Sequence, residues 1–201
     1  IILFLSIILH EIAHGYVAYL YGDNTAKFMG RLTLNPIPHI DILGSLLLPG
    51  ILLLSGSPFL IVWAKPVPVN PSNFKNPLKD MMIVSLAGPL TNFTLAIIFS
   101  IFLKILLLTN IIIISPQITT NILFAFKYGV IINLVLAVFN LFPIPPLDGS
   151  KVLLYFLPYE MKIKFLRFEP YGMIVIFVLV YFGILLPILL FIIKPILRVL
   201  L

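Results

Sequence analysis

The sequence predicts an all-α integral membrane protein: a polytopic helical bundle with one broken or re-entrant segment and a short strand near the functional site. Two observations carry this prediction. Of the 201 residues, 61% are apolar and 10% are charged, whereas soluble domains carry about 25% charged residues. Five apolar stretches, each long enough to cover a bilayer core of about 30 Å, dominate the chain: residues 1–21, 42–63, 81–108, 122–142 and 173–193.

The composition also excludes whole classes of function. A mean hydropathy of +1.19 leaves too few charges to cover a water-soluble surface, so soluble enzymes are excluded. The net charge of +6 comes without a basic patch that interleaves aromatic residues, so we expect no nucleic-acid partner and interpret it as the Lys/Arg bias of cytoplasmic loops. The expected surroundings are a lipid bilayer, and the expected location is the cell membrane, crossed several times.

Four of the five apolar stretches are expected to be helices that cross the membrane, because about 20 helical residues span the bilayer core. The stretch 42–63 differs from the others. It contains three glycines and two prolines, which suit a broken or re-entrant segment buried against protein better than a straight helix facing lipid: Gly44, Pro49, Gly50, Gly56 and Pro58.

The distribution of loop charges favours the re-entrant alternative. If all five stretches span, the loop and tail Lys/Arg divide seven against four between the two sides. If 42–63 enters and leaves on one side, nine lie together and two, Lys194 and Arg198, lie opposite. The second topology obeys the positive-inside rule better and leaves the uncharged connection 109–120 outside. The nine expected in the cytoplasm are Lys27, Arg31, Lys65, Lys75, Lys79, Lys151, Lys162, Lys164 and Arg167.

Two connections have a predicted backbone. The segment 63–80 contains four prolines and three asparagines, so it should be extended and rich in turns, with no helix before Pro77. The run 31–34 (RLTL) alternates polar and apolar residues and predicts a short strand. That strand could pair with an unwound substrate segment or pack on its own loop.

We expect one intramembrane domain over residues 1–201, since no repeat or accessory domain is evident. Residue 1 is Ile and lies inside an apolar run, so we expect the natural N-terminus to be truncated here. The chain has no cysteine, so any metal must be held by His, Asp, Glu or Asn.

A metal-binding pattern lies within the first apolar stretch. His10 and His14 are four residues apart in the run His-Glu-Ile-Ala-His, which puts both imidazoles on one helix face, within reach of one ion. Glu11 lies beside them and could take a proton from a water that the ion acidifies. Ionisable groups are costly inside apolar helices and usually mark function. The pattern therefore predicts a metalloprotease centre more strongly than polar packing.

A catalytic zinc usually takes three protein ligands, so a third donor is needed. Asp148 is the favoured donor, because prolines break the fourth helix just before it and leave irregular backbone near membrane depth. An isolated Asp before Gly is, however, more often a turn or a helix cap. The remaining candidates lie in expected loops: His39, Asp23, Asp41, Asp80, Glu160 and Glu169.

With these motifs, the chain resembles the site-2 protease family of intramembrane zinc metalloproteases, peptidase family M50. Three elements match in family order: the HExxH helix, Ala-Gly-Pro-Leu-Thr-Asn at 87–92, and Asn-x-x-Pro to Pro-Leu-Asp-Gly at 140–149. The connections look like those of the minimal bacterial or archaeal branch, without PDZ or CBS domains. Ser150 stands where many members have a second Gly.

The resemblance implies one Zn²⁺ per chain, held by His10, His14 and Asp148, with Glu11 as the general base. It also nominates Asn92 and Asn140 as polar groups near the cleft, for the oxyanion or the substrate. From the residues alone, helix packing is the commoner role of such asparagines. Gly88 and Pro89 are expected to allow close helix approach and a kink.

We therefore expect an endopeptidase that hydrolyses a peptide bond in or near a transmembrane segment of another membrane protein. The alternative is a zinc-binding membrane protein without protease activity, which would not need Glu11. A third possibility is a membrane protease of the same motif that recruits Glu160 or Glu169 as third ligand. The sequence leaves the substrate, a regulatory partner and the oligomeric state undetermined.

Overall fold

The computed structural model describes residues 1–56, 63–109 and 115–201, and these residues form helices and connections without any strand. The predicted all-α class is confirmed. Three helices are long and apolar enough to cross a membrane: α1 (Ile2–Leu20), α4 (Pro77–Thr109) and α5 (Pro116–Asn140). A bent pair formed by Tyr159–Tyr181 and Leu185–Leu200 makes a fourth if it is counted as one span.

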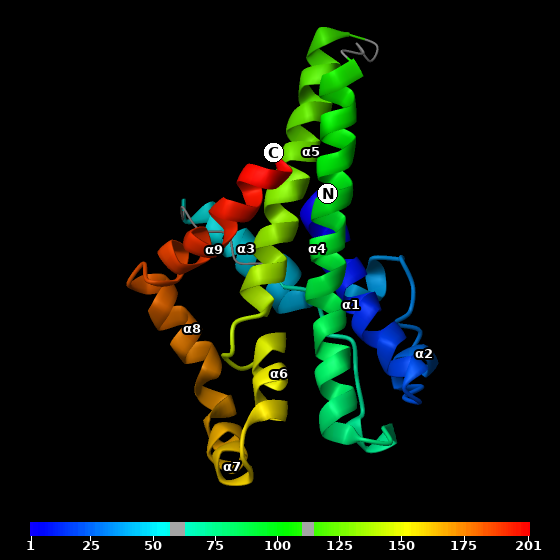
Figure 1. Ribbon diagram of the computed structural model, residues 1–201, viewed down its shortest axis with the longest axis vertical. Coiled ribbons are helices and arrows are strands. Elements are labelled where there is room, and N and C mark those ends of the chain that lie inside the picture. Colours follow the sequence, from blue (N-terminus) through cyan, green and yellow to red (C-terminus); the bar gives the residue numbers. More distant parts are fainter. Residues whose placement is uncertain (57–62, 110–114) are drawn as a thin grey trace.

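The long antiparallel helices α4 and α5 form the spine of the molecule (Figure 1). Helix α1 packs against α4, and the short helix α2 (Thr25–Phe28) follows α1 in the chain.

Side-chain hydrogen bonds define where the two spine helices, α4 and α5, begin. Pro77 opens α4, where Asp80 accepts a hydrogen bond from the Asn76 backbone N–H at 2.9 Å, and Ser115 caps α5 by accepting from the Ile118 N–H at 3.3 Å. Both arrangements satisfy N–H groups that a helix start leaves free.

The chain after α5 brings further helices around the lower end of the spine. Helix α6 (Asp148–Phe156) packs on α4, and α7 (Tyr159–Phe168) leads through a 3₁₀ turn, Glu169–Tyr171, into α8 (Gly172–Tyr181). Helix α9 (Leu185–Leu200) returns to α5 and closes an apolar core with α4 and α5. Ser100 and Lys104 of α4 donate hydrogen bonds to the Leu200 and Val199 carbonyls, so they satisfy the C-terminal end of α9.

The fifth apolar stretch is not one straight helix, which corrects the expectation. Its two halves lie in α8 and α9, and the pair Tyr159–Tyr181 and Leu185–Leu200, to which they belong, is bent by 81°. Gly183 adopts a φ of +66° at the break, a conformation that glycine accepts without steric cost and that ends helices. Pro187 in the first turn of α9 suits a new helix start. In the sequence, Gly183 indicated the end of one helix and Pro187 the start of the next.

The predicted strand at 31–34 is wrong. These residues form bends with no pairing partner in the described chain. Local hydrogen bonds form here instead of a ladder: the Arg31 N–H donates to the Ala26 carbonyl at 2.9 Å, and the side chains of Thr33 and Asn35 accept from the Asn35 and Ile37 N–H groups, both at 3.1 Å. Short side chains of this kind compete with strand pairing for backbone groups.

The stretch 42–63 is broken, as predicted. A π-helical turn, Ile42–Leu47, runs into α3 (Leu48–Leu54), and together they are too short for a bilayer core of about 30 Å. Trp63 lies back at the start of the stretch, because its N–H donates to Gly44 O at 3.2 Å and its carbonyl accepts from Ser45 Oγ at 2.8 Å. Pro58 and residues 110–114 of the expected outer connection lie outside the described residues.

The connection 63–76 is largely extended, and α4 begins at Pro77 as predicted. It departs from the prediction only in the 3₁₀ turn Pro71–Asn73. Asp23, just after α1, anchors this turn by accepting from the Asn70 N–H and from Asn73 Nδ2, both at 2.7 Å. This anchor fixes the connection along α1, which carries the His-Glu-Ile-Ala-His run.

Candidate metal centre

His10 and His14 lie on one face of α1, as their spacing predicts, and their Nε2 atoms are 3.0 Å apart. The other nitrogen of each ring contacts an acceptor on a different residue. His10 Nδ1 lies 2.5 Å from Asn92 Oδ1, and His14 Nδ1 lies 2.7 Å from the Val84 carbonyl. An acceptor at Nδ1 favours the tautomer with its proton there, so both Nε2 lone pairs are free for a metal.

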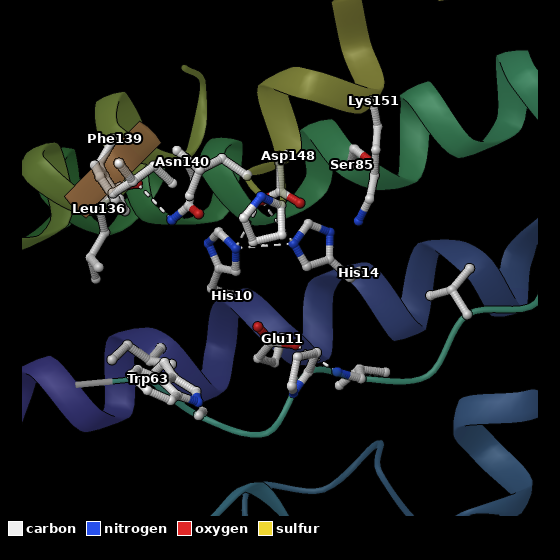
Figure 2. Close-up of a pocket in the computed structure, with 18 of the residues that line it drawn as sticks. His10, Glu11, His14, Trp63, Ser85, Leu136, Phe139, Asn140, Asp148 and Lys151 are labelled. Atoms are coloured by element: carbon white, nitrogen blue, oxygen red, sulfur yellow. Dashed lines mark hydrogen bonds and ion pairs between the residues drawn. The ribbon is translucent and has the colours of Figure 1, made fainter. Parts of the chain in front are cut away.

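Asp148 opens α6 and reaches the two histidines across the bundle (Figure 2). Its Oδ2 lies 3.1 Å from His10 Nε2 and 3.2 Å from His14 Nε2. All three residues are buried, with exposed fractions of 6 to 8%. Within the described part of the chain they form the single group of three or more His or carboxylate residues whose ligand atoms converge.

The geometry of this triangle fits zinc. Bonds of about 2.0 to 2.1 Å in a tetrahedral arrangement put neighbouring ligand atoms about 3.3 Å apart, and the three separations here are 3.0, 3.1 and 3.2 Å. Two neutral nitrogens and one carboxylate oxygen are also a usual ligand set for catalytic zinc. The other candidate third ligands, from both the sequence argument and the glutamate alternative, lie outside this group: His39, Asp23, Asp41, Asp80, Glu160 and Glu169.

Helix α4 contributes the floor of the centre through Gly88. A Cβ built on Gly88 would lie 2.4 Å from His14 Nε2 and 2.5 Å from His10 Nε2. Real Cβ contacts essentially never fall below 3.0 Å, so only glycine lets the α4 backbone approach the two rings this closely. The close helix approach expected of Gly88 is therefore present, and it occurs at the two histidine Nε2 atoms themselves.

Glu11 lies one residue after His10 and faces the connection that begins at Trp63 (Figure 2). Its Oε2 accepts a hydrogen bond of 2.7 Å from the Val67 N–H. Its Oε1 has no hydrogen bond to any residue that the structure describes. Nearby, the buried Arg31 donates from Nη2 to the Lys65 carbonyl at 2.6 Å. Burial lowers the pKa of Arg31, while the charge of Glu11 acts to raise it.

The two asparagines occupy different places. Asn92 is fully buried behind His10, where its Nδ2 donates to Asn133 Oδ1 at 2.9 Å, and it is not among the residues that line the cavity. Its amide is therefore used to hold His10. Asn140 does line the cavity, and its Nδ2 donates to the Leu136 carbonyl at 3.0 Å.

A cavity of about 650 Å³ opens onto the three converging residues and Glu11. Its walls are mainly apolar and come from α1, α4, α5, α6, α8 and the extended connection. Sequence reasoning missed two polar residues of this wall, Ser85 and Lys151. Each stands three positions from a residue that the motifs had marked, Gly88 and Asp148 respectively, and that helical spacing was the available signal.

Comparisons with known proteins place the chain among zinc metalloproteases. A family model described as peptidase family M50 matches residues 108–183. "Putative zinc metalloprotease YwhC" of Bacillus subtilis is 42% identical over 179 residues, which cover 89% of this chain and 78% of that protein. No solved structure gives a significant match.

Two further relatives match over shorter lengths. "Putative zinc metalloprotease Rip2" of Mycolicibacterium smegmatis is 32% identical over 94 residues, 47% of this chain and 35% of its own. "Putative zinc metalloprotease MJ0611" of Methanocaldococcus jannaschii is 43% identical over 70 residues, 35% of this chain and 31% of its own.

Proposed function

The chain belongs to the site-2 protease family, peptidase family M50, and is a zinc metalloprotease; from this premise we propose that it hydrolyses a peptide bond in or near a transmembrane segment of another membrane protein. In this proposal His10, His14 and Asp148 hold the zinc and Glu11 is the general base. The observation that carries it is the buried triangle of Nε2, Nε2 and Oδ2 atoms, 3.0 to 3.2 Å apart, in the wall of a mainly apolar cavity.

Zinc, when bound, supplies a Lewis acid that lowers the pKa of water and polarises the scissile carbonyl. The chain supplies the proton transfers. Val67 holds one oxygen of the Glu11 carboxylate, which leaves Oε1 to accept the proton of the attacking water. As water adds to the carbonyl carbon and the C–N bond breaks, the same carboxylic acid returns that proton to the leaving amine nitrogen.

The neighbours of the histidines keep this arrangement rigid. Asn92 and the Val84 carbonyl fix the ring orientation of His10 and His14 through their Nδ1 atoms. Replacing such a hydrogen-bond partner of a ligating histidine typically lowers metal affinity by about 10- to 100-fold. We therefore assign Asn92 to orienting His10, and keep Asn140, which lines the cavity, as a substrate or oxyanion contact.

The apolar wall supports a transmembrane segment as substrate. A peptide bond inside a helix has its carbonyl hydrogen-bonded, so the substrate must be extended where it is cut. The extended backbone beside Glu11 belongs to the connection at 64–69, part of which lines the cavity. Since no strand forms at 31–34, we place the edge for an unwound substrate on this connection.

We further propose that the chain is a multi-pass protein of the cell membrane with its basic loops in the cytoplasm. Helix α2, the connection before α4, and α7 lie toward one end of the molecule, and the α4–α5 end lies opposite (Figure 1). The return of Trp63 to Gly44 supports entry and exit of 42–63 on one side. Cysteine-accessibility labelling in intact cells should then modify Lys27→Cys and Lys75→Cys from the same face; labelling from opposite faces would make 42–63 a true span.

The decisive test separates zinc binding from hydrolysis. Glu11→Gln should keep about one zinc per chain but lose hydrolysis, because the amide fills the same space and cannot accept a proton. His10→Ala should lose zinc and activity together, because it removes one of three protein ligands. The measurements are metal content of the purified protein and cleavage of a peptide with a helix-destabilised apolar segment. If Glu11→Gln cleaved at the parent rate, the protease mechanism would be wrong and the non-proteolytic zinc protein would be the better description.

A further inference from the structure

One end of the cavity has two polar side chains that the proposed chemistry does not use. Ser85 and Lys151 both line the cavity, and Figure 2 shows them beyond His14, on the side away from Asn140. Ser85 is 1% exposed, and its hydroxyl has no hydrogen-bond partner in the described chain. A buried hydroxyl without a partner is unfavourable, so its place on the cavity wall indicates that a ligand supplies the partner.

Lys151 is placed toward the centre by the helix that carries Asp148. The two residues are three apart at the start of α6, so their side chains leave the helix on the same face. Apart from the two histidines, Lys151 is the single basic residue lining the described part of the cavity. It makes no ion pair there, because the described ion pairs join Asp148 to the histidines.

Neither acidic group of the cavity forms an ion pair with Lys151 in the described chain. Asp148 faces both Nε2 atoms, and Glu11 accepts from the Val67 N–H. An ammonium group has donors only, and it is costly in apolar surroundings without a counter-charge. A ligand that satisfies both Lys151 and Ser85 must therefore bring a negatively charged acceptor with at least two lone-pair sites.

We propose that Ser85 and Lys151 form a subsite that recognises a carboxylate side chain of the substrate, an Asp or Glu close to the cleaved bond. This inference rests on the proposed function, because it concerns the substrate of that same cavity. Three residues of helix advance about 4.5 Å, and an extended peptide advances about 3.3 Å per residue. The acidic residue thus lies within about three residues of the scissile bond. In an apolar segment, such a residue marks where cleavage occurs.

The test uses synthetic apolar peptides of about 20 residues with a central Gly-Asn pair, each carrying one Asp or one Asn at a position within three residues of that pair. Binding is measured by fluorescence anisotropy to the zinc-loaded Glu11→Gln protein. We expect the Asp peptide to bind about tenfold tighter than its Asn twin at one or two neighbouring positions, as for a charge-assisted hydrogen bond. Lys151→Met should abolish this preference, and Ser85→Ala should reduce it.

Charge reversal guards against a purely structural effect of the substitutions. Lys151→Glu should transfer the preference to a peptide with Lys at the same position. The matched control is Lys162→Met, which makes the same change on α7, away from the cavity wall, and should retain the parent preference.

The proposal is overturned if no position prefers Asp, if Lys151→Met retains the preference, or if it weakens Asp and Asn peptides equally. It is also overturned if Lys151→Met changes only binding to vesicles of anionic phospholipid, since the subsite would then hold a lipid headgroup. Failure of the proposed function is read separately: the parent enzyme would cleave none of the peptides, whatever their binding order.

Discussion

Replacing Gly88 with alanine probes the metal centre from outside its ligand set. The added methyl carbon would lie 2.4 Å from His14 Nε2, 2.5 Å from His10 Nε2 and 2.6 Å from His10 Cε1. An ordinary van der Waals contact begins at 3.4 Å, so each ring must retreat by about 0.9 to 1.0 Å, or α4 must move away from α1. Both adjustments displace atoms that we expect to bind zinc.

The size of the effect follows from the tolerance of zinc sites. Ligand distances in such sites hold to within about 0.2 Å, and the displacement required is several times larger. We expect zinc affinity to fall at least about 100-fold, which corresponds to about 2.7 kcal/mol. The cost to folding should stay near the 1 to 3 kcal/mol that is usual for overpacking, so the helices should still form.

The assay is zinc titration of the detergent-solubilised protein against a competing chelator, with far-ultraviolet circular dichroism as the folding check. Gly50→Ala is the matched control, since Gly50 also lies in a helix and a Cβ there would meet nothing within 4 Å. It should bind zinc like the parent. A folded Gly88→Ala protein that binds zinc with the parent's affinity would refute the placement of the metal between α1, α4 and α6.

Two further predictions concern groups that hold the site in place. Asn92→Ala should weaken zinc binding by about 10- to 100-fold, because His10 loses the acceptor that orients its ring. Competition with a chelator measures this affinity, and the control Asn140→Ala should keep the zinc affinity of the parent. Equal losses of affinity in both variants would contradict the assignment. Asp23→Asn should lower the unfolding temperature near neutral pH. Although burial raises the pKa of Asp23, hydrogen bonds from Thr25 and the 70–73 turn hold it below 3.8. The stabilisation that the Asp23 carboxylate gives the folded state is therefore present above pH 3.8 and is lost as the pH falls through the lower pKa of the folded state. The difference in unfolding temperature between parent and variant should therefore close on acidification. A gap that widens at low pH would contradict this sign.

The sequence by itself determined those features that depend on neighbouring residues. Three of the long apolar runs specify helices of membrane length, and α4 starts where Pro77 permits. The spacing of His10 and His14 specifies one helix face, because a helical turn brings residues i and i+4 together whatever surrounds them. The break in 42–63 also followed from local composition, since glycine and proline act on the backbone where they stand.

Only the tertiary structure decided what lies opposite these residues. Asp148 converges with the histidines from a position 138 residues beyond His10. The residues favoured Asp148 as the third ligand without excluding the other candidates, and the family resemblance supplied the assignment. The sequence left the role of Asn92 open between helix packing and catalysis. The structure places its amide on His10 Nδ1 rather than in the cavity. The strand at 31–34 failed for a similar reason. An alternating pattern records a preference, but a strand exists only where a second strand pairs with it. Here the Arg31 N–H donates to the Ala26 carbonyl and the Thr33 carbonyl lies 2.9 Å from His39 Nε2 instead.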